Sequence, residues 1–187
     1  MGNEGIPTNY RSFRFRSRLE ATWSVFFDRL GWEARWKYEP FDYDGYIPDF
    51  ALVFPAGNVL VEVKPCLTLG EMKRHTEKID RSPWSGEALI LGVGLISAGG
   101  NSRYLGLHGC LDYDPQAGRV WEPAVIHRCR DHVGFHAEYA GWWCRHGEEC
   151  DHHDFDVGGD WFDEQWALAQ NLVQWSPEAF TCDLPRR

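Results

Sequence analysis

Residues 46–65 read YIPDFALVFPAGNVLVEVKP, and this stretch predicts the centre of the fold. Two short apolar runs flank the segment Pro-Ala-Gly-Asn, which is typical of a tight connection, so we expect a β-hairpin. The second run carries Glu62 and Lys64, and Asp49 precedes the first run. Because strand side chains alternate between the two faces of a sheet, Glu62 and Lys64 should share one face.

These charges on an apolar strand have two interpretations. Glu62 and Lys64 could form a solvated ion pair on an exposed face. Alternatively, the hairpin places Asp49 beside Glu62, and the two carboxylates share a divalent cation, for which oxygen ligands favour Mg²⁺ or Mn²⁺. Lys64 could then orient or deprotonate a water and offset charge on a phosphorane-like transition state. This second interpretation predicts metal-assisted hydrolysis of phosphodiesters.

The flanking sequence predicts an α/β domain with a mixed sheet. An apolar stripe at helical spacing, followed by Gly31 as a C-cap, indicates a helix over residues 17–30. We expect strands over residues 33–39, 50–54, 59–64 and 88–94, a helix over 68–79, a hairpin turn at 114–118 and a final helix over 160–175. Up to residue 94 the order is helix, three strands, helix, strand.

The segments PDF, residues 48–50, and VEVK, residues 61–64, in this order of elements resemble the PD-(D/E)xK nuclease superfamily. That superfamily has a restriction-endonuclease-like core of the form αβββαβ. Over residues 10–95 the motifs look most like those of TnsA-type transposon endonucleases and related phage-encoded nucleases. The resemblance implies a Mg²⁺-dependent DNA endonuclease, with Mn²⁺ as a substitute metal.

The resemblance also implies roles for individual residues. Asp49 and Glu62 would bind the metal, with the carbonyl of Val63 as a third ligand. Lys64 would be the catalytic lysine. Glu20, on the first helix, would help to hold a metal or its waters.

Two of the acids have competing interpretations. Ser17 to Glu20 is also a capping box, in which Glu20 would satisfy the Ser17 N–H. Glu39 could join the site or lie in solvent at the end of a strand. Basic side chains near the first two predicted helices could contact DNA phosphates or lie in solvent: Arg11, Arg14, Arg16, Arg18, Lys73, Arg74 and Lys78.

A cluster of cysteine and histidine predicts a zinc site in the C-terminal third. Thiolate and imidazole ligands favour tetrahedral Zn²⁺, which would be structural here because four protein ligands leave no open position. The predicted ligands are Cys144, His146, Cys150 and His152, and Cys129 or His127 could replace one of them. The alternative is an acidic loop whose cysteines and histidines are incidental, since the spacing is not that of a well-known zinc finger.

The charge of the chain limits its partners. A net charge of −9 argues against a uniformly basic surface that coats nucleic acid. Eight acids and no Lys or Arg lie between Glu148 and Glu164, so that region should avoid DNA and could contact a basic partner protein. No apolar run is long enough for a transmembrane helix and no secretion segment is visible, so we expect no membrane association and a cytoplasmic location, in the host cell if the protein is phage-encoded.

We therefore expect three parts: a flexible lead-in over residues 1–9, a nuclease-like domain over 10–125, and a Cys/His-rich extension over 126–187 that ends in a helix. Six cysteines in such a chain are expected to be buried or metal-bound and not disulfide-bonded. The main functional alternative is a non-cleaving or partner-dependent protein of the same fold, acting as a DNA- or protein-binding component of a larger assembly. A homodimer would supply two sites for cutting both strands of a duplex.

Overall fold

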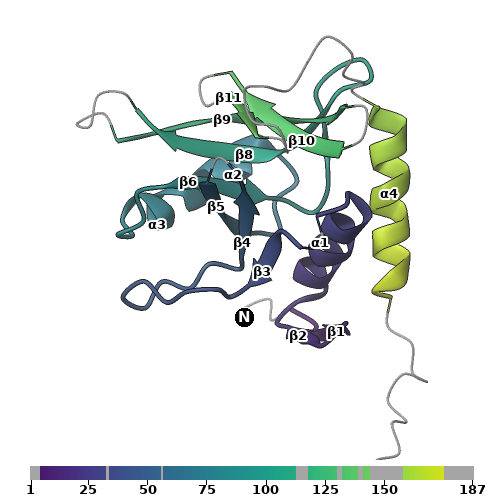
Figure 1. Ribbon diagram of the computed structural model, residues 1–187, viewed down its shortest axis with the longest axis horizontal. Coiled ribbons are helices and arrows are strands. Elements are labelled where there is room, and N and C mark those ends of the chain that lie inside the picture. The colour runs from purple at the N-terminus through teal and green to yellow at the C-terminus, as the bar shows by residue number, and fades with distance from the viewer. Residues whose placement is uncertain are drawn as a thin grey trace, which may run out of the picture.

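The computed structural model describes residues 5–32, 34–55, 57–112, 118–129, 132–138, 141–143 and 158–174 (Figure 1). The strands are β1 (Thr8–Tyr10), β2 (Phe13–Phe15), β3 (Trp36–Tyr38), β4 (Phe50–Phe54), β5 (Gly57–Val63), β6 (Glu87–Leu91), β7 (Ile96–Ser97), β8 (Arg103–Leu111), β9 (Arg119–Cys129), β10 (His132–Ala137) and β11 (Gly141–Trp143). The helices are α1 (Arg18–Arg29), α2 (Leu69–Met72), the 3₁₀ turn η1 (Lys73–His75), α3 (Thr76–Asp80) and α4 (Gly159–Leu172). The protein is thus a mixed α/β fold.

One large mixed sheet organises the molecule. Its strand order is β11-β10-β9-β8-β6-β5-β4-β3, and β7 pairs with β8 beside this path. Strands β5 and β6 are parallel, and the helical segment from α2 to α3 makes the crossover that a parallel pair requires. The other pairs of described strands are antiparallel. The predicted order of helix, three strands, helical segment and strand is therefore confirmed.

Helices cover both faces of the sheet. Helices α1 and α4 lie side by side (Figure 1), and their apolar faces join Phe50, Val61 and Leu89 in the larger core cluster. The opposite face packs Leu60 and Ile90 against the α2–α3 segment in a second cluster. Consecutive residues of β5 therefore point into different cores, as the alternation of strand side chains requires.

Helix α1 forms where its apolar stripe predicts it. The Ser17 hydroxyl caps it by accepting a hydrogen bond from the Glu20 N–H at 3.1 Å, and Gly31 follows it with a φ of 75°. Trp23, at the centre of the buried stripe, donates from Nε1 to the Gly92 carbonyl at 2.8 Å. This bond ties the middle of α1 to the residue that follows β6, and the end of β6 pairs with the end of β5.

The helix predicted over residues 68–79 is interrupted. The capping prediction is confirmed, because the Thr68 hydroxyl accepts a hydrogen bond from the Glu71 N–H at 3.2 Å. The segment then passes through the 3₁₀ turn η1 between α2 and α3. Met72 and Ile79 are the buried residues of this segment. Because the segment packs on the sheet at these two residues and has no continuous apolar stripe, packing does not stabilise one uninterrupted helix.

The C-terminal third has more regular structure than its composition indicates. Strand β9 continues to Cys129, and β10 and β11 extend the same sheet, so the expected boundary between residues 125 and 126 lies inside a strand. Val133, Phe135 and Ala137 are buried at every second position, which is the pattern that stabilises β10 as a strand. The histidines between them make this pattern hard to recognise in the sequence. At the other end, Thr8 and Asn9 of the expected lead-in belong to β1.

The described cysteines agree with the expectation of buried residues. Cys66, Cys110 and Cys129 are buried, and Cys66 and Cys110 are free thiols. Within the described part of the chain, no helix is both long enough and apolar enough to cross a membrane.

Candidate active site

The β4–β5 hairpin brings two buried carboxylates together. Phe50 pairs with Val61, so one step further along the register Asp49 lies opposite Glu62. Asp49 is 4% exposed and Glu62 is 2% exposed. Asp49 Oδ2 accepts a hydrogen bond from the Val63 N–H at 2.7 Å. Because the N–H and C=O of one strand residue lie on the same strand edge, the Val63 carbonyl lies on the edge that faces Asp49.

Lys64 joins these carboxylates from the same strand. Its Nζ forms an ion pair with Glu62 Oε2 and lies 3.6 Å from Asp49 Oδ2. The side chain is 23% exposed, so the ammonium lies at the border between the protein interior and solvent. The structure thus brings together Asp49, Glu62 and Lys64, the three residues of the predicted constellation.

The electrostatics of the three groups favour the charged form of Lys64 and disfavour the ionised form of Asp49. Burial raises the pKa of Asp49 to about 6, and the charge of Glu62 adds to this effect, while Lys64 and the Val63 amide oppose it. Burial works against the charge of Lys64, but Asp49 and Glu62 outweigh it and raise the pKa of Lys64. Lys64 is therefore a cation at neutral pH, which suits charge stabilisation and excludes a role as general base in this state.

Arg16 is a site residue that the sequence-based interpretation did not identify as such. It pairs with Asp49, and its Nε lies 3.0 Å from Glu39 Oε1 and 3.9 Å from Glu20 Oε2. Its side chain is 56% exposed. These three carboxylates raise the pKa of Arg16 against the opposing effect of burial. No spacing rule could identify this contact, because Arg16 and Asp49 are separated by 33 positions.

Glu20 is both a capping residue and a neighbour of the site. Its Oε1 accepts from the Ser17 hydroxyl at 2.9 Å, and its Oε2 accepts from the Arg16 N–H at 3.2 Å and from the Tyr38 hydroxyl at 2.9 Å. The capping box is thus modified, since the carboxylate accepts from the Arg16 amide and not from the Ser17 amide predicted. Glu20 reaches Asp49 through the Arg16 side chain.

Glu39 reaches Arg16 through an unusual backbone conformation. Its φ is 42°, in the left-handed region that residues other than glycine seldom adopt. Its N–H donates to the Asp49 carbonyl at 3.0 Å, which ties the end of β3 to the start of β4. A conformation of this kind next to buried charges is typical of functional sites.

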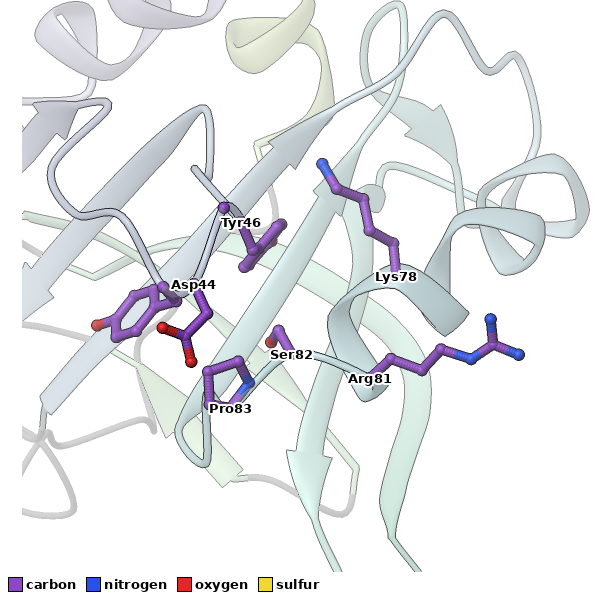
Figure 2. A pocket seen from close by; sticks show the side chains of 8 residues that line it. Asp44, Tyr46, Lys78, Arg81, Ser82 and Pro83 are labelled. Atoms are coloured by element: carbon purple, nitrogen blue, oxygen red, sulfur yellow. The ribbon is translucent and has the colours of Figure 1, made fainter.

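A pocket of about 510 Å³ adjoins the site on the α3 side (Figure 2). Lys78 and Arg81 come from the α3 segment, and Asp44 and Tyr46 come from the β3–β4 connection across from it. Lys78 Nζ lies 3.4 Å from Glu62 Oε1 and 4.7 Å from the centre of the Tyr46 ring. Burial raises the pKa of Tyr46, and the charge of Glu62 raises it further, so the phenol stays neutral.

Several of the other basic residues are ion-paired, and several are exposed. Arg11 forms an ion pair with Asp28 at 3.0 Å, and Arg81 pairs with Glu77. Arg18 is partly buried. The exposed cations on or beside the two elements that flank the site are Arg14, Lys73, Arg74, Lys78 and Arg81.

The donor set at the hairpin fits a hard divalent cation. Two carboxylates and a backbone carbonyl, from Asp49, Glu62 and Val63, are the oxygen ligands that Mg²⁺ takes when water completes its octahedron. Among the residues that the structure describes, no group of three or more His, Cys, Asp or Glu side chains is arranged to hold a metal. A Mg²⁺ here would therefore depend on the Val63 carbonyl and on water. The predicted zinc ligands Cys144, His146, Cys150 and His152 lie outside the described residues.

Comparison of the chain with protein-family models, curated proteins and solved structures gave no significant match.

Proposed function

We propose that this protein is a metal-dependent DNA endonuclease of the PD-(D/E)xK type, which hydrolyses phosphodiester bonds. The observation that carries the proposal is the meeting of Asp49, Glu62 and Lys64 at one end of the β4–β5 hairpin. The order α1, β3, β4, β5, helical segment and β6 around it is compatible with a restriction-endonuclease-like core.

Each residue has a definable task in this proposal. Asp49 and Glu62, with the Val63 carbonyl, would hold Mg²⁺ or Mn²⁺, which when bound supplies Lewis-acid activation of a phosphate oxygen. The Lys64 ammonium would donate hydrogen bonds to a phosphate oxygen or to the attacking water and offset the charge that develops on phosphorus. Glu20 would orient Arg16, and Arg16 would place a second cation at the edge of the site.

The charge distribution supports contact with DNA over a limited surface. Four carboxylates of the site, Glu20, Glu39, Asp49 and Glu62, are paired with three cations, Arg16, Lys64 and Lys78. Arg14, Lys73, Arg74 and Arg81 are exposed cations that flank this group, while the whole chain carries a charge of −9. We therefore expect phosphate contacts on the face that bears α2 and α3 and not over the whole molecule.

Cleavage of supercoiled plasmid, a single strand and a branched duplex tests the proposal. The assays contain Mg²⁺, Mn²⁺ or EDTA, and Lys64→Ala and Asp49→Asn are compared with wild type. We expect metal-dependent cutting that each substitution lowers by about 100-fold or more, as when a group that stabilises transition-state charge is removed. Lys37→Ala, at an exposed lysine of β3, is the matched control and should cut like wild type. Equal cutting by all variants would reject this site.

A second function is favoured by one specific observation. Arg16, Lys64 and Lys78, which belong to the same chain, already neutralise most of the negative charge of the site's carboxylates. This is the arrangement expected of a site that no longer needs a metal. The protein would then be a non-cleaving or partner-dependent component of a DNA-binding assembly. Absence of both cutting and Mn²⁺ binding by pure wild-type protein would favour this function, whereas cutting restored by cell extract would indicate a required partner.

A further inference from the structure

The pocket beside the candidate active site has aromatic side chains on one side and a lysine on the other (Figure 2). Tyr43 and Tyr46 come from the β3–β4 connection, and Lys78 comes from α3. Lys78 Nζ lies 4.7 Å from the centre of the Tyr46 ring, which is a cation–π contact. The volume of about 510 Å³ lies within the range of small-ligand sites.

The aromatic side of the pocket is held in place before any ligand binds. Tyr43 and Tyr46 exchange two backbone hydrogen bonds of 2.9 Å across a two-residue turn. The turn residues Asp44 and Gly45 have φ values of 50° and 85°, as a type I′ turn requires. The Tyr43 ring also packs against Trp84, with 5.6 Å between the ring centres. A ligand that enters this pocket therefore pays little to order the protein around it.

The side chains that line the pocket match the separate parts of a nucleotide. Tyr43 is only partly buried and offers an aromatic surface on which a base can stack. The exposed carboxylate of Asp44 can accept a hydrogen bond from the amino group of a base, whereas it would repel a bare phosphate. The side chain of Lys78 is 57% exposed, and its ammonium can bind a phosphate. This combination favours a nucleotide over a free phosphate ion.

The position of the pocket relates it to the candidate active site. Lys78 Nζ lies 3.4 Å from Glu62 Oε1, so the cation of the pocket also reaches a carboxylate of that site. A nucleotide bound at Lys78 would bring the next phosphate of its strand towards Glu62 and Lys64. A base inside a duplex is paired and stacked, and it can enter such a pocket only after it has left the duplex.

We propose that this pocket binds one unpaired nucleotide of the DNA strand that is cut, so that the substrate class is DNA with a single-stranded segment next to the cleaved bond. Tyr43 stacks on the base, Asp44 accepts a hydrogen bond from it, and Lys78 contacts its phosphate. The cutting step rests on the proposed nuclease function, but the binding of an unpaired nucleotide can be measured without it.

Fluorescence anisotropy of the full-length protein in EDTA tests the binding without cleavage. The probes are a labelled single strand of about 12 nucleotides and a duplex of the same length. We expect the single strand to bind about 10-fold more tightly than the duplex, whose bases must first be unpaired. Tyr43→Leu keeps an apolar contact for Trp84 but removes the aromatic face, so it should weaken single-strand binding about 10-fold. Tyr104→Ala is the control, because Tyr104 is also partly buried but lines a different pocket, and it should bind like wild type.

A second measurement uses the wild-type protein and does not depend on how well a variant folds. A single strand that contains iodouracil is cross-linked to the protein by light, and the attached residue is identified by mass spectrometry. We expect attachment at Tyr43 or Tyr46. Cross-links only outside the pocket, or equal binding of the single strand by wild type and Tyr43→Leu, would overturn the proposal. Binding of the duplex or of deoxythymidine monophosphate as tight as that of the single strand would overturn it as well.

The same experiments separate this proposal from the nuclease function. Single-strand binding that depends on Tyr43, without cutting in Mg²⁺ or Mn²⁺, would support the pocket and reject the nuclease. Cutting of fully paired DNA that depends on Lys64, without any preference for a single strand, would support the nuclease and reject the pocket.

Discussion

Asp49 is a buried carboxylate whose surroundings oppose its ionisation. Its pKa is raised to about 6, with burial as the largest cause. Because this value lies above the ordinary 3.8, the folded protein binds a proton more tightly than the unfolded chain between about pH 4 and pH 6. The free energy of unfolding therefore falls as the pH rises through this window, by an amount on the order of 2–3 kcal/mol.

We predict that Asp49→Asn is more stable than wild type at pH 8 in EDTA. The amide keeps the shape of the side chain and removes a charge whose ionisation is unfavourable, so the gain should be on the order of 2 kcal/mol. The gain should shrink below pH 4, where Asp49 is protonated in both states. Urea denaturation at several pH values measures it. The exposed residue Asp44 provides the control Asp44→Asn, which should change stability by less than about 0.5 kcal/mol.

Arg16 competes with a metal for the same carboxylates. Its guanidinium pairs with Asp49 and lies 3.0 Å from Glu39, yet more than half of the side chain is exposed and can move away. If Mg²⁺ or Mn²⁺ binds at Asp49 and Glu62 as proposed, Arg16 must share Asp49 with it. The metal affinity should therefore depend on this arginine.

We predict that Arg16→Gln binds Mn²⁺ about 10-fold more tightly than wild type, which corresponds to about 1.4 kcal/mol. Titration calorimetry without DNA measures the affinity. Arg14→Gln, at an exposed arginine of the same strand region, should leave it unchanged. Unchanged or weaker Mn²⁺ binding by Arg16→Gln would mean that Arg16 does not oppose the metal.

At the scale of elements, helix α4 stabilises α1 through aromatic contacts. The Trp166 ring lies 4.5 Å from the centre of Trp23 and 5.3 Å from that of Phe26. Arg29 adds hydrogen bonds from Nε and Nη2 to Gln165 Oε1 at 2.9 and 2.6 Å. Since α1 carries Glu20 and follows Arg16, α4 supports the site from a distance.

We predict that Trp166→Ala lowers the free energy of unfolding by about 3–5 kcal/mol, as expected for removing a buried aromatic side chain. Leu168→Ala on the same helix removes a side chain that is 38% exposed, so its cost should stay within about 1 kcal/mol. Denaturation in urea, followed by circular dichroism, compares the two. Similar losses for both variants would show that α4 does not pack on α1 as described.

At the scale of the whole molecule, the two expected parts share one sheet and one core. Strand β9 pairs with β8 and with β10. Trp32 donates from Nε1 to the Val133 carbonyl at 2.9 Å, and the Phe135 ring lies 5.8 Å from that of Phe54. Cutting the chain after residue 125 would therefore expose the larger core.

We predict that a fragment of residues 1–125 does not fold. It lacks β10, which contacts Trp32, and α4, which contacts Trp23. The described part of the remaining chain has no other element to bury these two tryptophans. Near-ultraviolet circular dichroism of fragment and full chain measures the fixed packing of their aromatic side chains. A fragment with native-like signals and a cooperative thermal transition would restore the independent domain that the sequence predicts.

Local patterns allowed several elements to be predicted. Helix α1, the β4–β5 hairpin and the Thr68 cap follow from apolar periodicity, turn residues and capping residues close together in the chain. The proximity of Asp49 to Glu62 and Lys64 also follows, because a hairpin register is set locally. The interruption of the 68–79 helix could not be predicted, since it depends on where the sheet offers apolar contact.

The sequence by itself thus determined the mixed α/β class and the hairpin that presents Asp49, Glu62 and Lys64. Only the tertiary structure brought Arg16 and Lys78 to these carboxylates and joined the C-terminal strands to the central sheet. The reason is physical: alternation, capping and turns act over a few residues, whereas contacts between distant segments depend on how whole elements pack. Arg16 meets Asp49 because α1 packs against one face of the sheet, and Lys78 meets Glu62 because α3 packs against the other.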